Sequence, residues 1–374
     1  MWRSEPLPFK SKPIEFNMLK IILITILVIL IVIALGVWWL LRKFKSVLKV
    51  IKEEMENKPM HPPCRVNPQV EPNPQWRSPA EIKKFTDEFL AHGFTSLGAF
   101  TLPETGGLQI AAFVNETERL YGTIYDHQKM PPNIDIVGDL EDGGELSGSN
   151  TKFGDAVDRR PEVIAIRLDG GGVKELLEAV QEHPTQSPRK PVNGADFAEY
   201  FRLSYAKAMN WRMKRGGTTR EEIRRQAKKD RTELTEEEFE EVYWQQRESD
   251  MTELQAGCIA QYLDEQKPAA VEWDQIQHRV FAVPTPLTEA EVIELLETHC
   301  DLDEEQTHRL KQIKLAFGQT ALDFMQQVMA GNLGGLGLKR LGSVQEPVPA
   351  EIYLAPDDED DEDLEDESQA GVEK

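Results

Sequence analysis

The chain has 374 residues and a formal net charge of −22 at pH 7. A charge this negative opposes approach to a phosphate backbone, so it argues against general nucleic-acid binding. The three cysteines, Cys64, Cys258 and Cys300, are far apart and odd in number, which is not typical of a disulfide framework and suits a reducing compartment.

An apolar segment near the N-terminus predicts a single membrane-spanning helix. No charged residue lies between Ile21 and Leu41, and a helix of that length spans about 30 Å, the thickness of the hydrocarbon core. We place an N-terminal segment at 1–18 and the transmembrane helix at 19–41. The run is longer than the apolar core of a cleaved signal peptide, and two tryptophans stand at its end. Both features favour a retained anchor.

The charges on either side of this span predict its orientation. More lysine and arginine residues follow the span than precede it, so the positive-inside rule places the C-terminal domains in the cytoplasm. Residues 42–58 predict a juxtamembrane amphipathic helix with an apolar seam of Leu41, Phe44, Leu48, Ile51 and Met55. The seam can lie on the lipid surface, or it can pair two copies of the chain in a homodimer.

The next two segments predict a linker and a first domain. Residues 59–77 contain six prolines and predict a semi-rigid linker that lifts the domains off the bilayer. Residues 78–183 predict an α+β domain, in which an antiparallel meander sheet has flanking helices. Ser78-Pro79-Ala80-Glu81 has the pattern of a capping box at a helix start. Five strand patterns follow, "LQIAAFV", "RLYGTIY", "NIDIVGDL", "GELSGSN" and "EVIAIRL", and then a helix over 173–183.

The sequence predicts that the C-terminal half of the chain is mainly helical. A linker at 184–194 leads to an α-helical domain at 195–330, with capping boxes that start at Thr219, Thr235 and Thr288. One long last helix is predicted by the apolar stripe of Leu310, Ile313, Phe317, Phe324 and Val328. Residues 331–356 form a Gly-rich segment that ends in a strand pattern. Residues 357–374 predict a disordered acidic tail, because a run of like charges repels itself.

A block of basic residues stands out in this acidic chain. Eleven basic residues lie between Arg202 and Arg231, and the acidic stretch 233–241 follows directly. The two segments can be neighbouring helices with complementary charged faces, whose exposed ion pairs contribute about 0–1 kcal/mol each. The block can also contact anionic lipid headgroups, hold the acidic tail, or bind nucleic acid, which the net charge opposes. As a contact surface it would consist of Arg212, Lys214, Arg215, Arg220, Arg224, Arg225, Lys228 and Lys229.

Five carboxylates crowd the hairpin between the third and fourth strand patterns: Asp135, Asp139, Glu141, Asp142 and Glu145. Their spacing does not match an EF-hand loop, and the histidines and cysteines lack metal-ligand spacing, so we expect no metal and no cofactor. A solvated hairpin tip is the simpler interpretation. If the domain is catalytic, the sequence points to Asp139, Asp142, Tyr121 and Tyr125, because carboxyl and phenol groups transfer protons.

The sequence therefore predicts a membrane-anchored, non-catalytic adaptor or assembly protein that presents cytoplasmic interaction domains to a protein partner. This expectation rests on the anchor, the linker, the paired charge blocks and the absence of a catalytic motif. The alternative is a membrane-bound enzyme of unknown reaction, with a carboxylate-lined site in the α+β domain. A concave pocket with converging carboxylates would favour the enzyme, and a flat sheet covered by helices would favour the adaptor.

Overall fold

A computed structural model describes residues 62–127, 130–151, 157–229, 231–331 and 336–357. Residues His61–Lys374 form one compact unit, separate from Met1–Met60. The predicted transmembrane helix, the juxtamembrane helix and the acidic tail beyond residue 357 lie outside the described residues. None of the helices in these ranges is both long and apolar enough to cross a membrane, so the anchor stays a prediction.

The first half of the compact unit is built on a seven-stranded sheet in which strands adjacent in sequence are adjacent in space. The strands are β1 (Gln69–Val70), β2 (Thr95–Leu102), β3 (Leu108–Asn115), β4 (Leu120–Asp126), β5 (Asn133–Asp139), β6 (Glu145–Ser149) and β7 (Val163–Arg167). Each pairs antiparallel with the next, except that β6 and β7 are parallel. The α+β domain is therefore confirmed, but the meander is antiparallel only up to β6.

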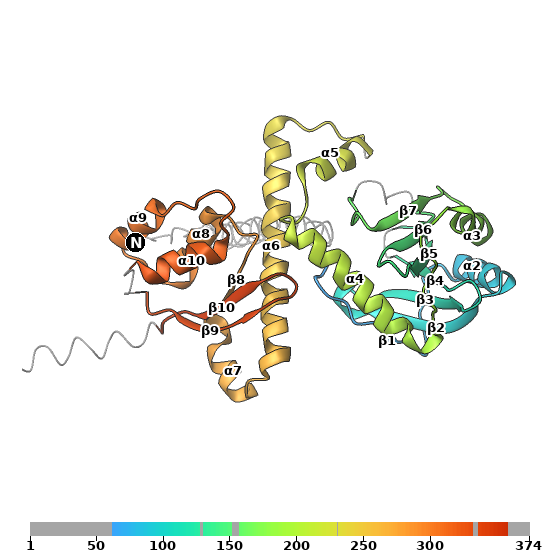
Figure 1. The fold of residues 1–374 in the computed structure, drawn as a ribbon, viewed down its shortest axis with the longest axis horizontal. Helices are drawn as coiled ribbons and strands as arrows, with labels where there is room; N and C mark the ends of the chain where they lie inside the picture. Colours follow the sequence, from blue (N-terminus) through green and yellow to red (C-terminus); the bar gives the residue numbers. More distant parts are fainter. Residues whose placement is uncertain (1–61, 128–129, 152–156, 230, 332–335, 358–374) are drawn as a thin grey trace, which may run out of the picture. The chain divides into compact units, whose positions relative to one another are not determined.

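One face of this sheet is covered by α2 (Pro79–Ala91) and α3 (Val173–Glu182) (Figure 1). Phe89 of α2 stacks on Phe113 of β3 with 4.6 Å between ring centroids. Gly122 makes room for this ring, since a Cβ atom there would lie 2.4 Å from Phe89. The capping box expected at the start of α2 does not form, because the Ser78 side chain makes no capping hydrogen bond.

The opposite face of the sheet is covered by the first turns of α4 (Phe197–Lys214). Phe197 lies 5.4 Å from Phe100 of β2 between ring centroids. Tyr200 lies 4.6 Å from Tyr121 of β4, again between ring centroids. The hydroxyl of Tyr121 donates a hydrogen bond to the carbonyl of Asn193 at 2.8 Å. The helix thus has an aromatic surface that packs on the sheet, and its C-terminal end continues into the second half of the chain.

The second half combines helices with a small sheet. The helices are α5 (Arg220–Lys229), α6 (Glu236–Gln266), α7 (Ala270–Ile276), α8 (Glu289–His299), α9 (Glu304–Gln312) and α10 (Ala321–Ala330). The sheet is antiparallel, with β10 (Ala350–Leu354) between β8 (Val280–Pro284) and β9 (Lys339–Val344). The prediction of an all-helical domain at 195–330 is therefore corrected, because β8 lies inside that range. Its five residues are all buried, and so short an apolar run shows no strand periodicity.

Two local predictions in this half have different outcomes. The capping boxes at Thr235 and Thr288 are confirmed, since each side chain accepts from the backbone N–H three residues later. The single long last helix is wrong. α9 ends at Gln312 and α10 begins at Ala321, so Phe317 lies fully exposed in the loop between them. Gly318 reverses this loop at a φ of +85°, a conformation that favours glycine.

A buried ion pair joins α6 to α8. Arg247 is 7 % exposed and donates two hydrogen bonds to the carboxylate of Glu291, at 2.5 and 2.8 Å. It also donates to the carbonyls of Gly216 and Pro286, both at 3.1 Å. Burial alone would raise the pKa of Glu291, but the hydrogen bond from Arg247 and the capping bonds from Thr288 lower it.

The described part of the proline-rich segment packs into the fold. Cys64 and Val66 are buried, and the Cys64 thiol donates to the carbonyl of Glu253 in α6 at 3.3 Å. Tyr205 of α4 donates to the carbonyl of Pro63 at 2.8 Å. Residues 62–77 therefore belong to the compact unit, whereas the sequence led us to expect a spacer outside it.

A candidate ligand-binding cavity

A cavity of about 470 Å³ lies between the α4 face of the large sheet and α4 itself. This volume falls within the range of small-molecule sites in proteins, about 300–1,000 Å³. Pro62 and the segment 157–160 complete the wall. The cavity is thus lined by elements that lie far apart in the sequence.

Strand alternation explains which sheet residues line the cavity. Successive side chains on a strand point to opposite faces, so every second residue of β4, β5 and β6 faces α4. The lining residues from these strands are Thr123, Tyr125, Asp135, Val137, Glu145 and Ser147. In the sheet register Thr123 lies opposite Asp135, and Val137 lies opposite Ser147. The sheet thus contributes a mostly polar wall.

The helix contributes the apolar wall. Phe197, Phe201, Ser204, Ala208 and Trp211 line the cavity at spacings of three and four residues, so they lie along one face of α4. The Ser204 hydroxyl and the Trp211 indole N–H are the polar groups on this stripe, and large aromatic rings dominate the rest. One wall of the cavity therefore offers hydrogen-bonding groups, and the other offers flat apolar surface.

Asp135 and Tyr125 are neighbouring polar groups of the cavity wall. Burial is the main reason that the pKa of Asp135 is raised, although a hydrogen bond from Ser149 and the charge of Arg159 oppose it. Burial, together with the nearby Asp135 carboxylate, also raises the pKa of Tyr125 well above its usual value. Tyr125 is therefore a neutral hydrogen-bonding group at physiological pH.

Glu145 joins the sheet to the helix across the cavity. Its carboxylate lies 2.9 Å from the guanidinium of Arg160, and the two side chains are 13 % and 14 % exposed. Ser204 of α4 donates a hydrogen bond to the same carboxylate at 3.2 Å. Burial raises the pKa of Glu145, although Arg160 and Ser204 oppose the shift.

Within the described ranges, Arg159 is a cation of the cavity wall that forms no ion pair. Its guanidinium donates one hydrogen bond to the hydroxyl of Ser147 at 3.2 Å. Among the residues that the structure describes, no carboxylate oxygen lies within 4 Å of it. Arg160, by comparison, is paired with Glu145, and Arg212 lies 3.9 Å from the Asp250 carboxylate and also donates to Thr218.

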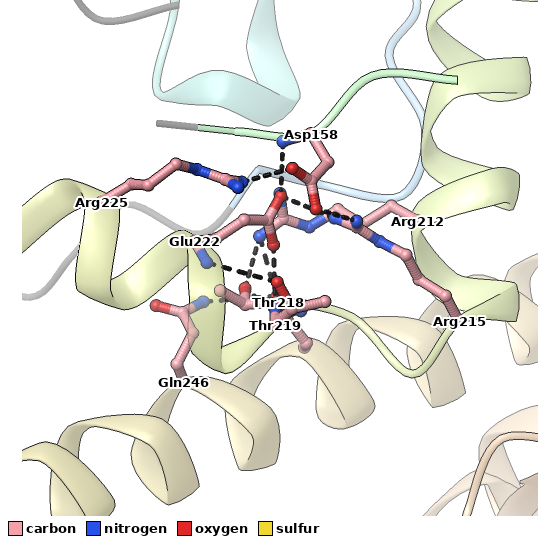
Figure 2. A network of polar contacts seen from close by, with 9 residues as sticks. Asp158, Arg212, Arg215, Thr218, Thr219, Glu222, Arg225 and Gln246 are labelled. Atoms are coloured by element: carbon pink, nitrogen blue, oxygen red, sulfur yellow. Dashed lines mark hydrogen bonds and ion pairs between the residues drawn. The ribbon is translucent and has the colours of Figure 1, made fainter. Parts of the chain in front are cut away.

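Asp158 belongs both to the cavity wall and to a network of ion pairs that holds α5 (Figure 2). Its carboxylate accepts from Arg215 at 2.7 Å and also pairs with Arg225. Burial alone would raise the pKa of Asp158, but the hydrogen bonds from these two guanidinium groups lower it. The backbone N–H of Asp158 donates to Glu222 of α5 at 2.7 Å.

Glu222 is the centre of this network. Its side chain is 3 % exposed and accepts from Arg215 at 2.6 Å and from the backbone N–H of Thr219 at 2.8 Å. Figure 2 shows the Asp158 and Glu222 carboxylates between the guanidinium groups of Arg215 and Arg225. A cavity residue and the first turn of α5 are therefore directly bonded.

The turn that leads from α4 to α5 is fixed by a second buried carboxylate. Asp250 of α6 accepts from the backbone N–H and the hydroxyl of Thr218, both at 2.6 Å. Gly217 has a φ of +82°, and a Cβ atom there would lie 2.5 Å from the Asp250 carboxylate. Only glycine gives both this backbone conformation and this close approach.

Five of the eight residues of the predicted basic contact surface are exposed, and Arg212, Arg215 and Arg220 are half-buried. Arg212 and Arg215 are engaged as described above. Arg220 donates to both carboxylate oxygens of Glu240 and lies over the ring of Tyr243. Lys214 and Lys228 are exposed, and neither has an ion pair within the described ranges. The remaining members of the predicted surface are Arg224, which lies over the Phe239 ring, Arg225, which pairs with Asp158, and Lys229, which is exposed.

The predicted sheet candidates are separated by the structure. Tyr125 lines the cavity, whereas Tyr121 is buried beneath α4. Asp139 and Asp142 do not line it. Asp139 lies opposite Glu145 in the sheet register, and the Asp142 carboxylate accepts from the backbone N–H of Gly144 in the hairpin turn.

Sequence reasoning therefore missed part of the site. Of the five hairpin carboxylates, only Asp135 and Glu145 line the cavity. Arg159, Ser147 and Ser204 were not recognised, because nothing in the local sequence brings them together. The strand alternation of "NIDIVGD" did contain the signal that Asp135 shares a face with Val137.

The described ranges contain no group of three or more histidine, cysteine or acidic residues that could hold a metal ion. Comparisons with protein-family models, curated proteins and solved structures give no match for this chain. We therefore state the class of protein from its fold and its cavity alone. It is an α+β domain with flanking helices and a ligand-sized cavity, joined to a second half of helices and a small sheet.

Proposed function

We propose that the chain is a membrane-anchored, non-catalytic adaptor whose α+β domain binds a small molecule. The observation that carries this proposal is the cavity between the large sheet and α4, which has the size and the lining of a ligand site. The membrane anchor and the cytoplasmic orientation come from the sequence alone.

The cavity is better suited to binding than to catalysis, because two of its three lining carboxylates are already engaged in ion pairs. Glu145 is paired with Arg160, and Asp158 is paired with Arg215 and Arg225. A general base needs a free lone pair within reach of a substrate proton. Paired groups of this kind instead form a fixed wall against which a ligand can be oriented.

The ion-pair network offers a route from the ligand to a partner. A ligand in the cavity contacts the wall that includes Asp158, and Asp158 holds α5 through Arg225 and Glu222. The exposed Lys214 ends α4, and the exposed Lys228 lies in the last turn of α5. Ligand binding would then stabilise the surface that meets a protein partner or anionic lipid headgroups.

A thermal-unfolding screen of the full chain in lipid nanodiscs tests the proposal. A ligand at 100 times its Kd stabilises the folded state by about 2.7 kcal/mol, which raises the Tm by several degrees. Ala208 lines the cavity, so Ala208→Trp should abolish such a shift by filling the space. The adjacent Lys207→Trp is the matched control, because Lys207 is exposed and does not line the cavity. Equal shifts in both variants, or no shift with any compound, would refute ligand binding in the cavity.

A second candidate function is favoured by one observation. The Ser204 hydroxyl donates to a Glu145 carboxylate whose pKa is raised, which is the arrangement of a nucleophile beside a base. A membrane-bound enzyme would use this pair on the cavity ligand. In that case Ser204→Ala would abolish turnover of the bound compound but retain its binding, whereas an adaptor returns the compound unchanged.

A further inference from the structure

We infer that the ligand of this cavity is a singly charged organic anion with a flat apolar body, and that Arg159 binds its anionic group. This inference rests on the proposed function, because it names the class of molecule that the cavity takes.

Among the residues that the structure describes, Arg159 is a lining cation without an ion pair within 4 Å. Three carboxylates and three guanidinium groups line the cavity. Glu145 and Arg160 neutralise each other, and Asp158 is neutralised by Arg215 and Arg225. Arg159 keeps a single hydrogen bond to a neutral hydroxyl. A guanidinium has five N–H donors, so most of the hydrogen-bonding capacity of Arg159 is available to a ligand.

Asp135 does not take the role of partner to Arg159. The Ser149 and Tyr125 hydroxyls bond to its carboxyl group, whereas its Oδ1 is buried without a hydrogen-bond partner. Asp135 and Arg159 interact through charge, but they form no ion pair within 4 Å. Burial also raises the pKa of Asp135 and so disfavours its charged form. A negatively charged group on the ligand is therefore the best partner for the Arg159 guanidinium.

A cation or a multiply charged anion fits the wall less well. A cation would have to compete with Arg160 for Glu145, across a pair that is only 2.9 Å long and largely buried. A phosphate with two charges would find one free guanidinium and no second one among the lining residues. A carboxylate matches a single guanidinium fork in both charge and shape.

The aromatic residues of the cavity wall favour a flat apolar body in the ligand. Phe201, Tyr205 and Trp211 line the cavity from α4, and Tyr125 lines it from β4. Aromatic rings gain from offset or edge-on contact with another ring, beyond the area that is buried. A flat ring system can therefore lie along α4 while its carboxylate reaches Arg159 on the other side.

Three probes with one ring body test the inference. We would measure the binding of 2-naphthoate, 2-naphthamide and 2-naphthylmethylammonium to the full chain in lipid nanodiscs, and subtract their uptake by empty nanodiscs. The expected result is at least a tenfold preference for naphthoate over the amide and weaker binding of the ammonium. Arg159→Gln should remove that preference and leave the affinity for the amide unchanged. Arg309→Gln is the matched control, because Arg309 is an exposed arginine that does not line the cavity.

The possible outcomes separate the two proposals. If the amide or the ammonium binds as tightly as naphthoate, the inference is refuted, but the cavity remains a ligand site. If no probe binds, both the inference and the proposed function are refuted for ligands with a ring body. The comparison among probes needs only the unmodified chain, so it decides the question even if Arg159→Gln fails to fold. An unchanged preference in a folded Arg159→Gln protein would also refute the role of Arg159.

Discussion

Replacing Glu222 by glutamine should loosen α5 without unfolding the rest of the protein. Glu222 accepts hydrogen bonds from Arg215 and from the backbone N–H groups of Asp158 and Thr219. Glutamine keeps the shape but offers one oxygen. It therefore leaves a backbone N–H without a partner and turns a charge-assisted bond into a neutral one.

The size of the effect follows from these losses. An unsatisfied buried donor costs about 1–3 kcal/mol, and losing the charge from a hydrogen bond costs about 1 kcal/mol. We therefore expect the opening of α5 to become easier by about 2–4 kcal/mol. At the lower limit this corresponds to about a 30-fold change in the opening equilibrium. Glu221→Gln is the matched control, because Glu221 is 70 % exposed and contacts Arg224 at 3.8 Å. Its loss should cost less than about 1 kcal/mol.

Hydrogen–deuterium exchange of the full chain in nanodiscs measures this local opening. Peptides from α5 should exchange about 30-fold faster in Glu222→Gln, while peptides from α8 exchange at the unmodified rate. The double variant with Arg215→Met should lower the free energy of α5 opening by less than the sum of the two single variants, because the two side chains share one ion pair. Equal exchange of α5 in Glu221→Gln and Glu222→Gln would show that the buried network does not hold the helix.

Three further predictions concern the rest of the structure. Gly122→Ala should lower the free energy of unfolding by about 1–3 kcal/mol in urea titrations, since the new Cβ would lie 2.4 Å from the Phe89 ring. Arg247 lowers the pKa of Glu291 in the folded state in spite of burial. The ionised Glu291 carboxylate therefore adds fully to the free energy of unfolding above its ordinary pKa of 4.5, and this stabilisation is lost as the pH falls through the lower pKa of the folded state. The Tm difference between the unmodified chain and Glu291→Gln should accordingly shrink below that pH, and a constant difference would contradict this. Burial raises the pKa of the Cys258 thiol to about 12, so a thiol-reactive dye should label it only after unfolding.

The helix starts and most strands could be predicted because their signals are local. A capping box needs only a threonine and an acidic residue three positions later, which is why Thr235 and Thr288 were recognised. β2 was missed because a register shift between Ser96 and Gly98 interrupts its alternation. The loop between α9 and α10 was missed because an apolar residue, Phe317, continues the helical stripe although it faces solvent.

The site was harder to predict than the fold because it is a tertiary arrangement. Tyr125, Asp135 and Glu145 lie on the strands where the sequence already indicated polar chemistry. Arg159 and Ser204 come from a connection and from a helix, and neither carries a motif. The predicted contact role of the basic block stays a prediction. Its charge is conspicuous in the sequence, but the sequence does not show that two of its arginines, Arg212 and Arg215, pair with the buried carboxylates of Asp250 and Glu222.

The hydrogen bond between Cys64 and α6 has a consequence for the order in which the chain folds. The strands of the large sheet pair with their sequence neighbours, so they can associate soon after each is synthesised. Cys64 must wait for a partner 189 residues further along the chain. At about 5–20 residues per second, that delay is about 10–40 s of translation. During this interval the Cys64 thiol is accessible, so labelling it on stalled ribosomes would show when α6 closes over the N-terminal segment.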